Sequence, residues 1–379
     1  MASEVVAQLD GEALVAALAS QLAAMRGALR SGNEAAHRFP TDIVAMLRRL
    51  GVLVAPLPRH AGGFGWGTEA AGISALCETL RILGHASLAA GRIFEAHVNA
   101  IALLFRYGDA VIRTAAAGAV RSGQLFALWV APAKEPVRAI RHGTRLHVTG
   151  RKAYCTAAGI ADRAVITALT EQDGEQMILV DTTEAVIDSA APVALHGMGG
   201  TSTKAVTFDC MVPPEHCIGE TGDYLREPEF SVGAWRTSAV TVGGLQALVE
   251  ETILQLRTRD RHTNPHQAAR VGQMLIQLHN ASDWVRSAAR RSVSHQSDPR
   301  HLTGYVNLAR IAIEQCCLEV IPLVQRSLGL PGLLADNPVE PMMRDLVTYL
   351  RQPAGDEALV EAAVTFAEAI QPASLGDLL

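Results

Sequence analysis

The residue types that bind metals do not occur in metal-binding patterns in this sequence. The six cysteines include no C-x-x-C pair, and Cys316 and Cys317 are adjacent, so we expect buried thiols. His262 and His266 are four residues apart, but Pro265 between them disfavours the helix that would place both on one face. We therefore expect no metal site.

Arg257, Arg259 and Arg261 stand in the short run LQLRTRDRHTNPHQ, where guanidinium groups are typical of a solvated basic helix end. No G-x-G-x-x-G run follows a strand pattern, so we do not expect NAD to bind.

The composition excludes several classes of protein. The 379 residues are 49% hydrophobic and 19% charged, which predicts a folded chain of two or three domains. A net charge of -5 without any Lys/Arg-rich run argues against nucleic-acid binding. The N-terminus lacks the basic start and cleavage site of a signal peptide, and no apolar stretch reaches membrane-spanning length. We expect a cytoplasmic protein without a membrane span.

Three blocks of different periodicity divide the chain and predict an α+β fold. Residues 1–122 have apolar positions at helical spacing and predict an N-terminal helical domain. Residues 123–228 carry short β-branched or alternating runs between turn residues, which predict an antiparallel, β-barrel-like middle domain. Residues 229–379 predict a C-terminal four-helix bundle from four long periodic stretches, Thr237–Leu256, Ala268–Ser292, Leu302–Leu328 and Asp356–Ile370.

This order of blocks resembles the acyl-CoA dehydrogenase family, and four local motifs agree with it. LPRHAGGFGWG resembles the family's loop after the first helices, and LHVTGRKAYCTAAGIADRAVITA resembles its strand pair with a G-x-K-x-aromatic-x-T core. HGMGGTSTKAVTFDCMVPPEHCIG resembles the strand that ends the β-domain, and NPVEPMMRD resembles the Arg-Asp stretch near the C-terminus. The resemblance implies an FAD-dependent oxidoreductase that acts on an acyl-CoA or similar small substrate. It also implies a homodimer or homotetramer, served by an electron-transfer flavoprotein or a flavin reductase.

The resemblance also implies which residues meet the flavin ring, which in this family lies between the β-domain and the bundle. Main-chain groups of Val130 and Ala131 would meet the ring edge, Tyr154 would flank the ring, and Thr156 would offer a hydroxyl near the flavin N5. The chain departs from the family at Ala131, where a threonine is usual, and in the shortened loop that follows it.

On the pyrophosphate side, the resemblance implies a role for one arginine, one glutamine and one glycine turn. The arginine is Arg259, with Arg257 and Arg261 as neighbouring choices, and the glutamine is Gln267. Gly329 and Gly332 are the two glycines that remain of the family's three-glycine turn on the adenosine side.

At the positions where the resemblance places the catalytic base, the chain has no residue that could act as one. The family's dehydrogenation uses a glutamate to remove the α-proton of the thioester, and the main-chain N–H of that residue helps to bind the enolate oxygen. Nine residues after Arg344 the chain has Pro353, which offers neither group. The family's other base position, before Arg236, is Trp235. Asp356 is a weaker candidate, because acids are also typical of helix starts.

Two other functions stay open for this sequence. A flavin-dependent monooxygenase on the same fold, like the dibenzothiophene monooxygenases, uses reduced flavin and oxygen and does not need the family glutamate. A non-catalytic binding or scaffold protein would have kept the fold and lost the chemistry.

Overall fold

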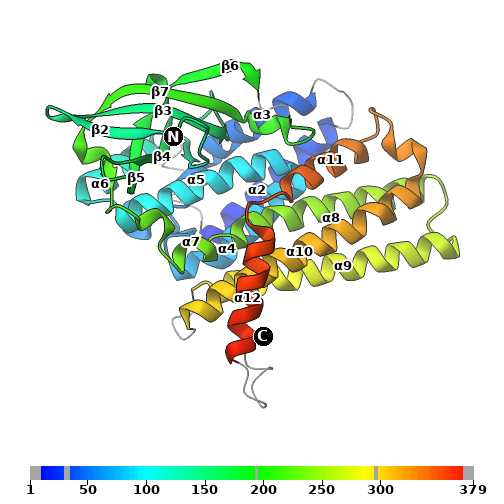
Figure 1. Ribbon diagram of the computed structural model, residues 1–379. Helices are drawn as coiled ribbons and strands as arrows, with labels where there is room; N and C mark the ends of the chain where they lie inside the picture. The colour runs from blue at the N-terminus through cyan, green and yellow to red at the C-terminus, as the bar shows by residue number, and fades with distance from the viewer. Residues whose placement is uncertain (1–9, 30–34, 193–194, 294–297, 370–379) are drawn as a thin grey trace.

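The computed structural model describes residues 10–29, 35–192, 195–293 and 298–369 (Figure 1). Its N-terminal part is helical, and the starts of α5 and α6 are among those with side-chain caps. Ser87 accepts a hydrogen bond from the Ala90 N–H at the start of α5, and Asp109 accepts one from the Ile112 N–H at the start of α6. The helices are α2 (Gly11–Leu29), α3 (Ala35–Leu50), α4 (Ile73–Ala86), α5 (Leu88–Tyr107) and α6 (Ala110–Arg121).

The middle of the chain forms one mixed sheet with the strand order β6-β7-β3-β2-β4-β5-β8, and β1 pairs with β4. Most neighbours are antiparallel, as expected, but β1 and β2 each run parallel to β4. Alternating apolar residues predict a strand without predicting its direction, so these parallel pairs were not predicted. The strands are β1 (Phe126–Trp129), β2 (Arg138–His142), β3 (Arg145–Cys155), β4 (Arg163–Leu169), β5 (Glu175–Asp181), β6 (Val186–Pro192), β7 (Lys204–Val212) and β8 (Cys217–Ile218).

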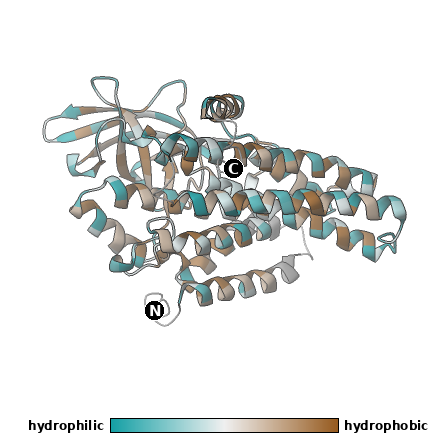
Figure 2. Cartoon of the chain, turned by 90° about the horizontal axis from the view of Figure 1, so that it is seen from below, coloured by the Kyte–Doolittle hydropathy of each residue, from teal (hydrophilic) through white to brown (hydrophobic). Residues whose placement is uncertain are grey.

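Helices return after the sheet, and the longest of them lie side by side (Figure 1). Asn264 caps α9 and Asp298 caps α10, and each cap is followed by a proline at the first helical position. Figure 2 shows hydrophilic and hydrophobic residues mixed along these helices, as expected for amphipathic packing. The helices are α7 (Glu229–Val232), α8 (Trp235–Thr258), α9 (Pro265–Arg291), α10 (Pro299–Leu328), α11 (Val339–Tyr349) and α12 (Gly355–Ala369).

The predicted α+β fold class is therefore confirmed, with a sheet between two groups of helices. The domain boundaries at residues 122/123 and 228/229 stay a prediction. The short helix α11 was not predicted, and it packs against α8 and α5.

Helices α4 and α8 cross in backbone contact and join the N-terminal helices to the bundle. A Cβ added to Gly84 would lie 2.1 Å from the Val240 carbonyl oxygen. A Cβ added to Gly243 would lie 2.1 Å from the Arg81 carbonyl oxygen. Only glycine leaves room for this crossing.

Helix α5 runs through the centre of the molecule. Among the described residues it is the one helix long and apolar enough to cross a membrane, and 72% of its apolar window is buried inside the protein. Its composition is therefore that of a core helix.

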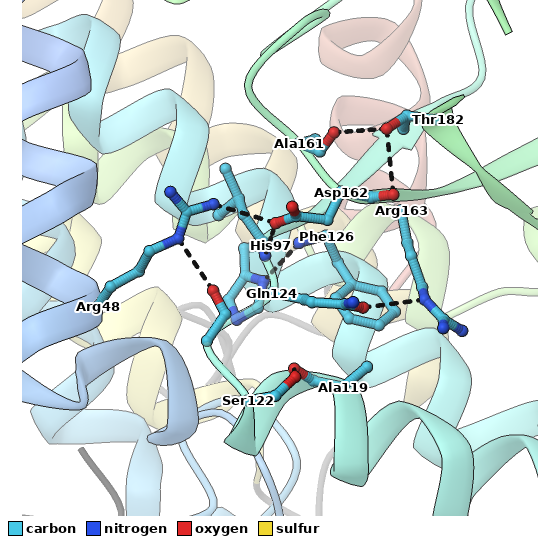
Figure 3. Close-up of polar contacts among 12 residues, drawn as sticks. Arg48, His97, Ala119, Ser122, Gln124, Phe126, Ala161, Asp162, Arg163 and Thr182 are labelled. Atoms are coloured by element: carbon cyan, nitrogen blue, oxygen red, sulfur yellow. Dashed lines mark hydrogen bonds and ion pairs between the residues drawn. The ribbon is translucent and has the colours of Figure 1, made fainter. Parts of the chain in front are cut away.

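A buried histidine on α5 ties three segments together (Figure 3). The His97 side chain has no exposed surface. Its Nε2–H donates to the Leu53 carbonyl at 2.9 Å, and its Nδ1 accepts the Phe126 N–H at 3.0 Å. Burial lowers the pKa of His97 from 6.5 to about 4, so the ring is neutral in the folded protein.

An ion pair lies beside this histidine and fastens α3 to the start of the sheet (Figure 3). Arg48 Nη2 lies 3.0 Å from Asp162 Oδ2, and Arg48 Nε donates to the Gly123 carbonyl at 2.9 Å. The same carboxylate accepts the Leu125 N–H at 2.7 Å. These contacts fix the chain just before β1, the strand that reaches the cavity described below.

The His97 site predicts a stability that falls in mild acid. The folded pKa lies below the unfolded one, so the contribution is complete above about pH 6.5 and is lost as the pH falls toward 4. Between about pH 7.5 and pH 5 the free energy of unfolding should fall by roughly 2 kcal/mol through this group. Urea unfolding of the wild type and of His97→Gln at both pH values measures it. The variant should be less stable at neutral pH and show a smaller fall, whereas an equal fall in both proteins would contradict this account.

Candidate active site

A cavity of about 850 Å³ lies between helix α5, the start of α8, strand β1, helix α10 and Gln352, which follows α11. The exposure of the lining residues shows which end of the cavity is closed and which is its mouth. Glu95 and Trp235 are 2% and 1% exposed and form the closed end, whereas Arg106, with 53% of its side chain exposed, lies at the mouth. His60 and Arg113 are also exposed and line the mouth.

A chain of polar contacts joins α5 to the first turn of α8 at the closed end. Arg92 forms an ion pair with Glu95. Glu95 Oε1 accepts from Asn99 Nδ2 at 2.5 Å and from the Thr237 hydroxyl at 3.4 Å. Asn99 Oδ1 in turn accepts from Arg236 Nη1 at 2.9 Å. The contacts hold the two helices at a fixed separation around a polar interior.

The sequence reading missed this polar chain. Arg92, Glu95 and Asn99 follow one another at three- and four-residue spacing on a helix that is mostly apolar. That spacing places them on one face, and three polar residues on one face of a core helix indicate a buried polar site.

Arg236 is the least satisfied charge at the closed end. Its Nε is buried without a hydrogen-bond partner, and among the described residues no carboxylate lies within 4.0 Å of its guanidinium. Its Cζ lies 5.7 Å from the centre of the Trp235 ring. Loss of solvent lowers the pKa of Arg236, and the negative charge of Glu95 opposes that shift.

Strand β1 brings its end to the cavity. Leu128 and Val130 line the cavity. Trp129 between them is 1% exposed, and its indole N–H donates to the Thr156 carbonyl at 2.8 Å. Successive strand residues point to opposite faces, so one tryptophan links the cavity strand to the end of β3.

A buried lysine fixes the main chain at the end of β1. Lys152 is 3% exposed, and its ammonium donates to the Val130 carbonyl at 3.0 Å and to the Thr167 hydroxyl at 2.8 Å. The Ala153 N–H donates to the Ala131 carbonyl at 3.1 Å. Burial lowers the pKa of Lys152, because charge is costly away from water. The two main-chain positions predicted to meet a flavin edge are thus held rigidly by β3.

Backbone strain gathers beside this strand end. Tyr154 (φ 53°), Ala157 (φ 61°), Met198 (φ 64°) and Ser202 (φ 49°) all adopt the left-handed region that non-glycine residues avoid. The Ala157 N–H donates to the Thr201 carbonyl, which joins the two strained segments. Tyr154 keeps 57% of its surface exposed, so its ring is available to a planar ligand. Clustered strain of this kind is typical of ligand sites.

The motif NPVEPMMRD, on α11, contacts the start of the motif HGMGGTSTKAVTFDCMVPPEHCIG. Asp345 Oδ1 accepts the Met198 N–H at 2.5 Å, and Arg344 Nη1 donates to the His196 carbonyl at 3.0 Å. Burial raises the pKa of Asp345, and its bond to Met198 opposes that shift. A Cβ on Gly197 would lie 2.3 Å from the Arg344 carbonyl oxygen. The Arg-Asp motif therefore clamps the loop that carries two of the strained residues.

The residues predicted for the pyrophosphate side lie at the far end of α8. Arg259 is exposed, bonds to Gln255 Oε1 at 3.3 Å, and lines a second hollow of about 440 Å³. Pro331, which stands between Gly329 and Gly332, lines the same hollow. The structure thus brings the arginine and the glycine turn together.

Gln267 lies apart from that hollow and is buried between α9 and α10. Its Nε2 donates to the Ser327 carbonyl at 3.1 Å, and its Oε1 accepts from Arg270 at 3.3 Å. Both ends of the amide are used in helix packing, and a role in cofactor binding stays a prediction.

The three expected positions of the base lie in different surroundings. Trp235 is part of the closed end. Pro353 is exposed, and its carbonyl accepts from Arg310 at 3.0 Å, while the preceding residue, Gln352, lines the cavity. Asp356 is exposed in the first turn of α12 and is not among the lining residues.

The sequence is similar to those of known enzymes. Residues 221–358 match the family described as "Acyl-CoA dehydrogenase, C-terminal domain". The cyclohex-1-ene-1-carbonyl-CoA dehydrogenase of Geobacter metallireducens (strain ATCC 53774 / DSM 7210 / GS-15) is 23% identical over 81% of this chain and 84% of its own. Residues 221–358 therefore form an acyl-CoA dehydrogenase C-terminal domain, and the chain as a whole is similar to acyl-CoA dehydrogenases.

Solved structures of acyl-CoA dehydrogenases and related flavoenzymes share the fold of this chain. Butyryl-CoA dehydrogenase from Megasphaera elsdenii superposes with a TM-score of 0.76, at 16% identity, over 86% of this chain and 90% of its own. Dibenzothiophene monooxygenase from Paenibacillus sp. A11-2 superposes with a TM-score of 0.80, at 20% identity, over 95% and 97%. The predicted family and the oxidoreductase class are confirmed.

The Gly197 contact can be tested with a neighbouring glycine as control. Gly197→Ala should destabilise the protein by about 1–3 kcal/mol, because its Cβ overlaps the Arg344 carbonyl. Gly199→Ala should change stability by less than about 0.5 kcal/mol, because no atom lies within 4 Å of its added Cβ. Urea unfolding of both variants measures the difference. Equal stability of the two variants would show that the clamp does not hold the loop against α11.

Proposed function

We propose that this protein is an FAD-dependent oxidoreductase that binds an acyl thioester or a similar small substrate in the 850 Å³ cavity. The observation that carries the proposal is the entry of strand β1 into that cavity, with Leu128 and Val130 among its lining residues. Similarity to acyl-CoA dehydrogenases supports the cofactor and the class of reaction. The cytoplasm is the proposed location.

The residues at the ends of β1 and β3 fit a flavin ring. Val130 and Ala131 present main chain held by Lys152 and Ala153, and Tyr154 offers an exposed aromatic ring. Thr156 follows it at the end of the strand. Bound FAD would supply a two-electron acceptor at this place. Arg259 with the turn of Gly329 and Gly332 would hold the pyrophosphate and adenosine side.

The protein's own groups would bind and orient the substrate and exclude water. Trp235 closes the inner end, and Arg236 and Asn99 offer polar groups there. The α8 helix begins at this wall, so its positive N-terminal dipole faces the cavity. These features orient a substrate whose inner end is polar.

No free carboxylate lines the described part of the cavity. Glu95 is paired with Arg92, and Glu229 with Arg106. The Glu69 carboxylate accepts the Arg59 N–H at 2.9 Å and lies 3.6 Å from its guanidinium. Removal of a thioester α-proton therefore lacks an obvious acceptor. This observation favours a second candidate function, flavin-dependent monooxygenation, because that chemistry does not need the family glutamate.

Assembly as a homodimer or homotetramer is proposed through the far end of the bundle. Leu330, Leu333 and Leu334 are 75%, 49% and 50% exposed and lie beside the hollow that Arg259 lines. Burial of these side chains against a second copy would remove apolar surface from water. An electron-transfer flavoprotein would take electrons from a dehydrogenase, and a flavin reductase would serve a monooxygenase.

FAD binding tests the cofactor assignment directly. Thr156→Val should weaken FAD binding about five- to tenfold, because one hydroxyl hydrogen bond is lost. Thr149→Val, on the same strand but distant from its end, is the matched control and should bind FAD like the wild type. Equilibrium titration of the apoprotein with FAD measures both. Failure of the wild type to bind FAD would overturn the proposed function.

Oxidation of a simple acyl-CoA distinguishes the two candidate reactions. Butyryl-CoA should bleach the bound FAD very slowly under anaerobic conditions, because loss of a positioned base costs about 10²–10⁴-fold in rate. Pro353→Glu should raise that rate if Pro353 occupies the base position. Rapid bleaching of the wild type would contradict this, and the same assay on Asp356→Asn would then test Asp356 as the base. Oxygen consumption with reduced FAD and substrate would identify the monooxygenase.

A further inference from the structure

The cavity has more positive than negative lining groups. Its arginines are Arg92, Arg106, Arg113, Arg236 and Arg310, and its carboxylates are Glu69, Glu95 and Glu229. An enclosed site lined by an excess of one charge attracts ligands of the opposite charge.

Most of these charges have partners within the protein. Arg92 and Arg106 are paired with Glu95 and Glu229. Arg310 donates to the carbonyl groups of Pro353 and Ala354 at 3.0 and 3.1 Å. Arg113 lies exposed at the mouth, where water can solvate it. Among the described lining residues, Arg236 and Arg310 have no carboxylate within 4.0 Å, and of the two only Arg236 keeps a buried nitrogen without a hydrogen-bond partner.

Arg236 is positioned to bind a group that the protein does not supply. Its Nη1 is held by Asn99 at 2.9 Å, its Nε is buried without a partner, and Trp235 packs beside it. The guanidinium is thus oriented in advance, and the first turn of α8 adds its positive dipole.

We propose that the substrate carries a carboxylate at the end that enters the cavity first, and that Arg236 binds this carboxylate. The inference rests on the proposed function, since it places the substrate in the same cavity. A hydrocarbon chain at this point would remove water from Arg236 and give no hydrogen-bond acceptor in return. A carboxylate accepts two parallel N–H bonds from a guanidinium and compensates for the lost water.

Two thioesters of equal carbon number test the inference on the FAD-loaded protein. Succinyl-CoA ends in a carboxylate where butyryl-CoA ends in a methyl group. Isothermal titration calorimetry should show that the wild type binds succinyl-CoA about 10- to 100-fold more tightly. This comparison needs no variant and no turnover. Equal affinities for the two esters, or no binding of either, would overturn the inference. The proposed function would still stand in that case, provided that the protein binds FAD.

Variants locate the selectivity in one side chain. Arg236→Gln should bind succinyl-CoA about 10- to 100-fold more weakly than the wild type and so lose the preference over butyryl-CoA. Arg300→Gln, an exposed arginine at the start of α10, is the matched control and should keep the preference. A preference that persists in Arg236→Gln would overturn the assignment. Loss of FAD from Arg236→Gln with the preference intact would identify a flavin phosphate as the anion and would also overturn it.

Discussion

The contact between helices α5 and α8 is the constraint on which the rest of the structure depends. Glu95 and Asn99 on α5 hold Thr237 and Arg236 in the first turn of α8, and Arg92 balances the charge of Glu95. Glu95 is 2% exposed and the other groups are partly buried, so most of their polar atoms need partners inside the protein. The requirement fixes both the separation of the two helices and the polarity of the cavity between them.

The sheet is attached to helix α5 by a hydrogen bond to the main chain of β1. His97, two residues from Glu95 on the same helix, bonds to the start of β1 at Phe126. From there β1 runs to Val130, whose carbonyl is held by Lys152 of β3. One helix therefore positions both the closed end of the cavity and the strand that borders it. A shift of α5 would move the two together, which preserves their relative geometry.

The periodicity of the sequence was enough to predict the order of helices, sheet and bundle, because that order depends on long apolar patterns. The motifs at Tyr154 and Thr156 predicted the strand end where strain gathers. Short helices and the pairing of strands could not be predicted from periodicity. Helix α11 is one short helix between longer ones, and the parallel pairing of β1 with β4 depends on contacts between distant segments. Arg236 entered the sequence reading only as the residue after a base position, because its lack of a counter-ion becomes visible only when the neighbouring helices are in place.

In the described cavity, the pairing of charges bears both on the lack of a free carboxylate base and on the surroundings of Arg236. Each carboxylate that lines it is adjacent to an arginine, so none is left to accept a proton from carbon. A family member that relies on a free glutamate needs an apolar interior, where a carboxylate is desolvated and becomes more basic. The paired charges of this cavity leave no such carboxylate, and Arg236 keeps a buried Nε without a partner. This polar interior is the basis of both proposals, the slow removal of an α-proton and a substrate that carries a carboxylate.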